Sequence, residues 1–342
     1  MEYEDLKIVH VNDVAFVGSN LVLGLCKNGV KTKLYKLSRF SEKKLPKILQ
    51  LGISIFFRII EIFRLKKYLK QEKINIIHVH YGTHAYLPFF LKVPFYLHIH
   101  GTDVRTHVNW PLVGIFVRWG IRNAERVFYS TPDLKPMVEK FRRDAIFFPN
   151  PVDTQKFFPK EGLGKNNDLT IFLINKLDRF KGNKKIITAL ELIWLDFSSL
   201  KVKMFGFGNI AEEFQCFIEN HSGEERLSIL PHISNSEMVE NIQTSDIIIG
   251  QLETGSLGVS ELEAMSCGKP VICKFNFSDM YPEPPPVLVA NTPEEVRDKL
   301  IFLINHPDEG EKIGQKAREW VVEYYDYRKV AQKLLNIYLE KK

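Results

Sequence analysis

The sequence predicts an α/β protein built from two doubly wound domains, each with a parallel sheet covered by helices. Short β-branched runs alternate with longer amphipathic stretches along all 342 residues, and this alternation is typical of parallel sheets. A chain of this length suits two domains of roughly 150 residues each. Apolar residues make up 45% of the chain and charged residues 26%, which excludes a disordered or fibrous protein.

The first half of the chain contains six predicted strands separated by helical patterns. The strands cover residues 7–11, 32–37, 74–80, 95–100, 126–130 and 145–149. From Pro149 to Asp168, proline, glycine, asparagine and charged residues replace the periodic pattern, which indicates a domain boundary. We therefore expect an N-terminal domain over residues 1–158.

The same alternation restarts in the second half of the chain. Predicted strands lie in "LTIFLIN", "KVKMFGFG", "LSILPHI", "SDIIIGQ" and "KPVICKF". We expect a second domain over residues 159–325 and a terminal helix over 326–342 that packs back toward the N-terminal domain. Two such domains would place the carboxyl ends of their sheets across a cleft, where ligands of α/β proteins bind.

Positive charge is concentrated in one part of the chain. Residues 27–73 hold fourteen Lys and Arg against three Glu, an excess of +11 within a total of +6. Such a patch suits anionic lipid, phosphate or nucleic acid, but no nucleic-acid-binding module accompanies it. The apolar stripe over residues 54–70 predicts a core helix with a solvated basic face.

The sequence offers no membrane span and predicts a cytoplasmic protein. Arg58 and Glu61 interrupt the longest apolar run, which is shorter than the ~20 residues that a span requires. The N-terminus lacks the basic start of a signal peptide, and four scattered cysteines predict reduced thiols. One hypothesis is that the basic patch docks on the inner face of the cell membrane. The alternative is that the same charges hold a soluble anionic acceptor.

Two loop-to-helix junctions carry the strongest chemical signals. In "INKLDRFKG", Lys176 and Lys181 flank a turn before a helix, an arrangement that favours a diphosphate; the alternative is a solvated basic turn. In "LETGSLGVSELEAMSCGKPVI", small residues precede a helix that carries Glu261 and Glu263. Residues two apart on a helix point in different directions, so only one of these carboxylates can face the cleft. The alternative is that Glu263 caps a loop and the other carboxylates are solvated.

Histidines crowd the ends of two predicted strands in "HVHYGTH" and "YLHIHGTDVR". His100 ends its strand and should point into the cleft, whereas His78 and His98 are expected in the core. His-x-His is also a metal-ligand spacing, so zinc must be considered. Only Gly18 lies between the first strand and its helix, and the absence of G-x-G-x-x-G argues against a dinucleotide cofactor.

Taken in order, these segments resemble family 4 glycosyltransferases, which are retaining enzymes of the GT-B fold. The resemblance covers nearly the whole chain and rests on "HGTDVR", "FPNPVDTQKFFP", "KLDRFKG", "FGFGN", "SELEAMSCGKPVI" and "IGQKAREWV". It implies a GT-B fold of two Rossmann-like domains. It also implies sugar transfer from a nucleotide-diphosphate donor to a lipid-linked or glycan acceptor, without a metal or other cofactor.

The resemblance also implies site residues. Those near the reacting sugar and the diphosphate are His100, Lys176 and Lys181. Those that bind the donor are Gly18, Gly206, His232, Gly255, Ser256, Leu257, Gly258 and Glu263. Within this set, Glu263 would bind the ribose hydroxyls of the donor.

The sequence departs from the family pattern at three positions. A second glutamate is common eight positions before the ribose-binding one, where this chain has Gly255. Lys176 stands where the family usually has Arg, and Val17 and Gly18 replace paired glycines. Gly255 and Lys176 keep open the alternative of a catalytically silent GT-B subunit. Two further alternatives are a sugar-nucleotide epimerase on the same fold and a metal-dependent hydrolase with a His-x-His zinc site.

Overall fold

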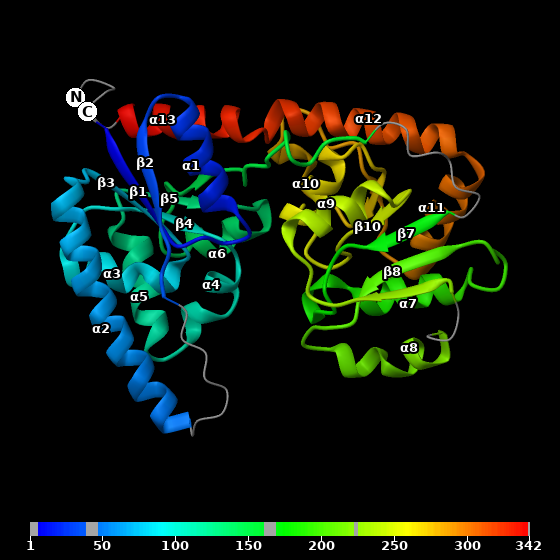
Figure 1. The fold of residues 1–342 in the computed structure, drawn as a ribbon, viewed down its shortest axis with the longest axis horizontal. Coiled ribbons are helices and arrows are strands. Elements are labelled where there is room, and N and C mark those ends of the chain that lie inside the picture. Colours follow the sequence, from blue (N-terminus) through cyan, green and yellow to red (C-terminus); the bar gives the residue numbers. More distant parts are fainter. Residues whose placement is uncertain (1–5, 39–46, 161–168, 222–224, 341–342) are drawn as a thin grey trace. The chain divides into compact units, whose positions relative to one another are not determined.

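The computed structural model describes residues 6–38, 47–160, 169–221 and 225–340, which form two compact units (Figure 1). Unit 1 comprises Met1–Pro151 and Tyr327–Lys342, and unit 2 comprises Val152–Asp326. The sequence placed this division after residue 158. Each unit has one six-stranded sheet whose paired strands all run parallel, which confirms the predicted α/β class.

The sheet of unit 1 has the strand order β2-β1-β3-β4-β5-β6. Its strands are β1 (Lys7–Val11), β2 (Lys31–Tyr35), β3 (Ile76–His80), β4 (Tyr96–Ile99), β5 (Arg126–Tyr129) and β6 (Ile146–Phe147). Its helices are α1 (Val17–Lys27), α2 (Lys47–Glu72), α3 (Tyr86–Leu91), α4 (Thr102–Arg105), α5 (Val113–Asn123), α6 (Lys135–Glu139) and α13 (Tyr327–Glu340).

The two faces of this sheet differ in composition because side chains alternate along each strand. One face presents aliphatic residues such as Val9 and Val79, which pack against α2, α3 and α5. The opposite face presents His10 and His78, and the Nδ1 atom of His78 hydrogen-bonds the hydroxyl of Tyr338 on α13 at 2.5 Å. Figure 1 shows α1 and α13 together on this second face.

The sheet of unit 2 has the order β12-β11-β10-β7-β8-β9. Its strands are β7 (Thr170–Leu173), β8 (Lys201–Phe205), β9 (Leu227–Leu230), β10 (Ile247–Ile249), β11 (Val271–Cys273) and β12 (Leu288–Val289). Its helices are α7 (Asn183–Glu191), α8 (Gln215–His221), α9 (Asn235–Gln243), α10 (Val259–Ser266), α11 (Pro293–Asn305) and α12 (Pro307–Tyr324). One apolar cluster contains α7 and α11, and another on the sheet's second face contains α10 and α12.

Helix α2 departs from the expected core helix. Leu65 is 1% exposed and belongs to the core of unit 1, but Ile59 and Phe63 are 47% and 68% exposed. The reason is that Ile59 and Phe63 lie on the outer side of α2, away from the side on which Glu61 and Leu65 are buried. No helix within the described ranges is long and apolar enough to cross a membrane.

Candidate active site

Four loops follow neighbouring strands at one edge of the unit 2 sheet. They come after β7, β8, β9 and β10, and the carboxyl ends of parallel strands meet at the same edge. These loops and the start of α10 hold most of the site residues named from the sequence. Those residues are Lys176, Lys181, Gly206, His232, Gly255, Ser256, Leu257, Gly258 and Glu263.

The loop after β7 packs directly on the loop after β10. The backbone N–H of Leu252 donates to the carbonyl of Lys181 at 2.9 Å, and Lys185 Nζ donates to the Leu252 carbonyl at 3.3 Å. Gly182 adopts φ +71°, and a Cβ there would lie 2.9 Å from that of Leu252. The structure thus brings together the two junctions that the sequence identified separately.

The loops after β8 and β9 extend this surface. A Cβ at Gly208 would lie 1.8 Å from the Leu177 carbonyl oxygen, so only glycine permits this close approach. Gly206 donates its backbone N–H to the Leu230 carbonyl at 3.1 Å. Beside it, the rings of Phe207 and His232 stack with centroids 3.6 Å apart, forming an aromatic platform with His232 exposed.

Glu261 is a structural carboxylate. It is fully buried, and its Oε1 atom accepts hydrogen bonds from Asn175 Nδ2 at 2.8 Å and from the Gln251 N–H at 2.9 Å. Its Oε2 atom accepts from the Gly258 N–H at 3.0 Å, which caps α10. The alternative in which Glu263 caps the loop and Glu261 is solvated is therefore wrong.

Glu263 is buried without a hydrogen-bond partner among the described residues. It is 7% exposed, and burial is the largest cause that raises the pKa of its carboxyl to about 8. Glu261 raises this pKa further, whereas the charge of Lys156 opposes the shift. The carboxyl of Glu263 is therefore available to a ligand.

The loop before α10 is organised by Gln251, a residue that the sequence analysis missed. Gln251 is 1% exposed; its Oε1 atom accepts from the backbone N–H groups of Glu253 and Thr254 at 2.9 and 2.7 Å. Its Nε2 atom donates to the Ser256 carbonyl at 2.8 Å. Only its position directly after a buried strand could have identified it.

Three predicted donor residues in this loop offer backbone rather than free side chains. Ser256 and Leu257 are each 3% exposed, and Leu257 belongs to an apolar cluster. Gly255 adopts φ +71°, and a Cβ there would lie 2.9 Å from Asn276 Nδ2. The position where the family commonly has a glutamate is thus built for glycine.

The two predicted diphosphate lysines differ in their surroundings. Lys176 has a 55% exposed side chain and pairs with Asp178 at 3.5 Å. Lys181 has no acidic partner among the described residues, and a Cβ built at Gly258 would lie 3.8 Å from its Nζ atom. Its ammonium group therefore lies beside the N-terminus of α10, where both would attract an anion.

In unit 1, a pocket of about 380 Å³ lies at the carboxyl ends of the first strands. It is lined by Asn12, Asp13, Val14, Ala15, Leu37, Ser38, Arg58, Tyr81 and His84. Gly18 packs against the loop after β1, because a Cβ at this position would lie 2.9 Å from the carbonyl oxygen of Asn12. The sequence analysis did not predict this pocket, because its lining comes from separate segments.

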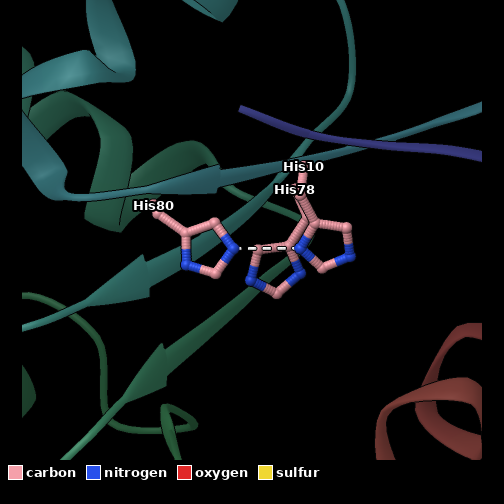
Figure 2. Close-up of side chains that lie close together, drawn as sticks. All are labelled: His10, His78 and His80. Carbon is pink, nitrogen blue, oxygen red and sulfur yellow. Dashed lines mark hydrogen bonds between the residues drawn. The ribbon is translucent and has the colours of Figure 1, made fainter. Parts of the chain in front are cut away.

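His100 ends a row of hydrogen-bonded imidazoles in unit 1. His10 Nδ1 contacts His80 Nε2 at 2.9 Å (Figure 2), and His80 Nδ1 contacts His100 Nε2 at 3.1 Å. Burial lowers the pKa of both His10 and His100 to about 3, so these two rings are neutral at physiological pH. His78 and His98 are fully buried beside them, as expected.

Two family descriptions match almost the whole chain. Residues 19–156 match glycosyltransferase family 4, and residues 153–320 match the glycosyl transferases group 1. The chain belongs to the family 4 glycosyltransferases.

Other proteins similar to this glycosyltransferase agree with that assignment. An uncharacterized glycosyltransferase of Methanocaldococcus jannaschii is 23% identical over 75% of the chain and 72% of its own length. The N-acetyl-α-D-glucosaminyl L-malate synthase of Bacillus anthracis is 23% identical over 79% of the chain and 76% of its own length. The HepE protein of Anabaena, solved with UDP-glucose, superposes with a TM-score of 0.72 over 98% of the chain and 100% of its own at 14% identity. That likeness shows the same GT-B fold.

The histidine group made of His10, His78 and His80 fits zinc poorly. Ring nitrogens of His10, His78 and His80 lie within 4.8 Å of one another, but zinc requires in-plane lone pairs that converge at about 2.0–2.1 Å. The His10 and His78 rings are parallel to within 13° and stacked at 4.8 Å, so their lone pairs do not converge. All three rings are fully buried, which leaves no open position for the water of a zinc hydrolase.

Proposed function

We propose that the chain transfers a hexose-like sugar from a nucleotide-diphosphate donor to a lipid-linked or glycan acceptor, with retention at the anomeric carbon. The donor assignment rests on one observation: two adjoining segments of unit 2 each carry an ionisable group that is free to bind a ligand. Glu263 offers a carboxyl without a hydrogen-bond partner, and Lys181 offers an ammonium without an acidic partner, among the residues described. These groups suit ribose hydroxyls and a diphosphate, respectively.

The proposed chemistry depends on stabilising the leaving diphosphate. Lys181 and, more weakly, Lys176 would neutralise the charge that develops as the glycosidic bond breaks, and the N-terminus of α10 would add to this effect. These cations would make a metal ion unnecessary. His100 would act as a neutral hydrogen-bonding group near the sugar, because burial keeps its pKa near 3. The UDP-glucose held by the similar HepE structure supports a nucleotide-sugar donor.

A panel of UDP-, GDP- and ADP-sugars tests this function. The correct donor at 100 times its dissociation constant should stabilise the protein by about 2.7 kcal/mol, seen as a raised melting temperature. Slow donor hydrolysis without acceptor would exclude a catalytically silent subunit. The absence of a shift with every donor would contradict the proposal.

Replacing Lys181 with alanine should lower turnover by about ten-fold or more, because one charge on the leaving group is lost. Lys176→Ala should have a smaller effect, since Asp178 already neutralises part of that charge. Steady-state kinetics with the identified donor measure both variants. Lys184→Ala is the matched control, because Lys184 is exposed and pairs with Glu213 at 2.5 Å. Equal rates for wild type and Lys181→Ala would contradict the diphosphate assignment.

Donor affinity should depend on pH through Glu263. In the free protein the pKa of Glu263 is about 8, and ribose hydroxyls that donate to its carboxylate would lower that pKa in the complex. The complex then binds fewer protons than the free protein, so affinity should rise with pH and level off above about 8. Calorimetry with UDP from pH 6 to 9 measures this slope. The Glu263→Gln variant is the control, because its affinity changes with pH only through other groups such as the nucleotide. If wild type and Glu263→Gln show the same slope of affinity against pH, the ribose assignment is contradicted.

For the acceptor, we propose entry at the unit 1 pocket and a location on the inner face of the cell membrane. Arg58 of α2 lines the pocket, so the basic patch of residues 27–73 reaches the place where an acceptor would enter. Lys66, Lys67 and Lys70 are exposed on the same helix. Lys43 and Lys44, which belong to the predicted basic patch, lie outside the described residues.

A further inference from the structure

The outer face of α2 is apolar between Phe56 and Phe63. Glu61 and Leu65 are 3% and 1% exposed and mark the side of α2 that faces the core. Phe56, Ile59 and Phe63 lie on the opposite side at helical spacing, and their exposed fractions are 60%, 47% and 68%. Large apolar side chains therefore face outward where a solvated helix would carry polar ones.

The same outer face becomes basic between Lys66 and Lys70. Lys66, Lys67 and Lys70 are all exposed and continue the line of Phe56 and Phe63. The carboxylates of α2 do not neutralise these lysines. Glu61 accepts hydrogen bonds from the Tyr35 hydroxyl at 2.7 Å and the Ser38 N–H at 3.3 Å, and Glu72 pairs with Lys33 at 3.1 Å.

Neighbouring helices extend the apolar surface. Phe90 of α3 is 55% exposed and contacts Phe116 of α5 with ring centroids 5.9 Å apart. Leu112 and Ile115, at the start of α5, are 70% and 51% exposed. Helices α2, α3 and α5 pack on the same face of the unit 1 sheet. We call Phe56, Ile59, Phe63, Phe90, Leu112 and Ile115 the apolar face.

We propose that unit 1 inserts this apolar face into an anionic lipid leaflet while Lys66, Lys67 and Lys70 bind the lipid headgroups. Exposed apolar surface of this extent on a water-soluble domain marks an interaction site. An amphipathic helix with large apolar residues on one part of its surface and lysines beside them is typical of helices that lie in the membrane interface.

Charge favours lipid over a protein partner as the occupant. Lysine is depleted from protein interfaces, whereas each lysine near an anionic leaflet contributes about 1 kcal/mol of attraction. Three exposed lysines without acidic neighbours on α2 therefore match a lipid surface better than a protein surface.

The inference deepens the proposed function and rests on it, because it identifies the leaflet as the source of a lipid-linked acceptor. Arg58 lies on the side of α2 that carries Glu61 and Leu65, opposite Phe56, and it lines the pocket. Its guanidinium carbon lies 5.9 Å from the ring centroid of Tyr86 on α3. The apolar face and the pocket therefore lie on opposite sides of α2, and a lipid-linked acceptor in the leaflet would reach the pocket around this helix.

Vesicle flotation of the full chain tests the proposal. Wild type should bind vesicles that contain anionic lipid and should not bind purely zwitterionic vesicles. A Lys66→Glu, Lys67→Glu, Lys70→Glu variant should bind at least ten-fold more weakly at low salt. A Phe56→Ser, Ile59→Ser, Phe63→Ser variant should keep weak binding at low salt but lose the part that resists high salt, because insertion does not depend on screened charges.

Two unit 2 substitutions serve as matched controls. Leu195 is 91% exposed and Lys316 is exposed on α12, so Leu195→Ser with Lys316→Glu should leave vesicle binding unchanged. Wild type that ignores anionic vesicles at low salt, or a serine variant that binds like wild type in high salt, would overturn the proposal. Self-association abolished by the serine substitutions would instead identify a second copy as the occupant.

The donor melting shift separates this inference from the proposed function. Every variant should retain the wild-type shift with the correct donor, since all substitutions that affect vesicle binding lie in unit 1. Normal donor binding without vesicle binding would overturn the lipid inference alone. Vesicle binding without any donor-induced rise in melting temperature would contradict the transferase proposal but would still support the lipid-binding surface.

Discussion

Replacing Glu263 with alanine should lower kcat/KM for the donor by about 10²- to 10⁴-fold. Two hydroxyl hydrogen bonds to one carboxylate contribute about 1.5–3 kcal/mol each, and every 1.4 kcal/mol corresponds to a factor of ten. Glu263 has no competing partner among the described side chains, so no hydrogen bond within the protein has to break when the donor binds. Steady-state kinetics over a range of donor concentrations measure the loss.

The matched control is Glu253→Ala in the same segment. Glu253 pairs with Lys185 at 3.3 Å and its side chain is 47% exposed, so its removal should leave the donor kinetics within about two-fold, as expected for a surface ion pair. A loss from Glu253→Ala that equals the loss from Glu263→Ala would reverse the assignment of the ribose ligand.

Replacing Glu261 with alanine should destabilise the fold by about 3–5 kcal/mol. The change leaves three buried donors unpaired, on Asn175, Gln251 and Gly258, and each unsatisfied group costs about 1–3 kcal/mol. Urea unfolding followed by circular dichroism should show the loss as a lower midpoint.

Glu261→Gln separates charge from hydrogen bonding. The glutamine carbonyl can replace one acceptor atom, but its amide nitrogen cannot accept from the second donor group. We expect an intermediate midpoint for this variant. A wild-type midpoint for Glu261→Ala would show that the buried network contributes nothing to stability.

The fold was predictable because its strands are buried and parallel. Such strands read as short continuous apolar runs, and "LTIFLIN" and "SDIIIGQ" became β7 and β10 in the centre of a sheet. Helix α2 shows the limit of this approach. Apolar residues occur around most of this helix, so periodicity could not show which side faces the core, and Ile59 and Phe63 were wrongly expected there.

The site was predictable where one segment carries the signal and not where distant segments meet. Lys181 and Gly182 form a recognisable loop-to-helix junction in sequence alone. The roles of Glu261 and Glu263 could not be separated by helical periodicity, because α10 is buried on both sides. The deciding contact comes from Asn175, 86 residues earlier in the chain.

The contact between His78 and Tyr338 has a consequence for the synthesis of the chain. Unit 1 is discontinuous, so its first strands leave the ribosome long before α13 exists. At about 5–20 residues per second, translation of the intervening unit takes on the order of 10–40 s. During that interval the sheet face that α13 will cover presents His10 and His78 beside apolar side chains such as Ile8 and Tyr96. The imidazoles make this face more polar than the aliphatic face that α2, α3 and α5 cover, so the nascent domain should be less prone to aggregate before its last helix is made.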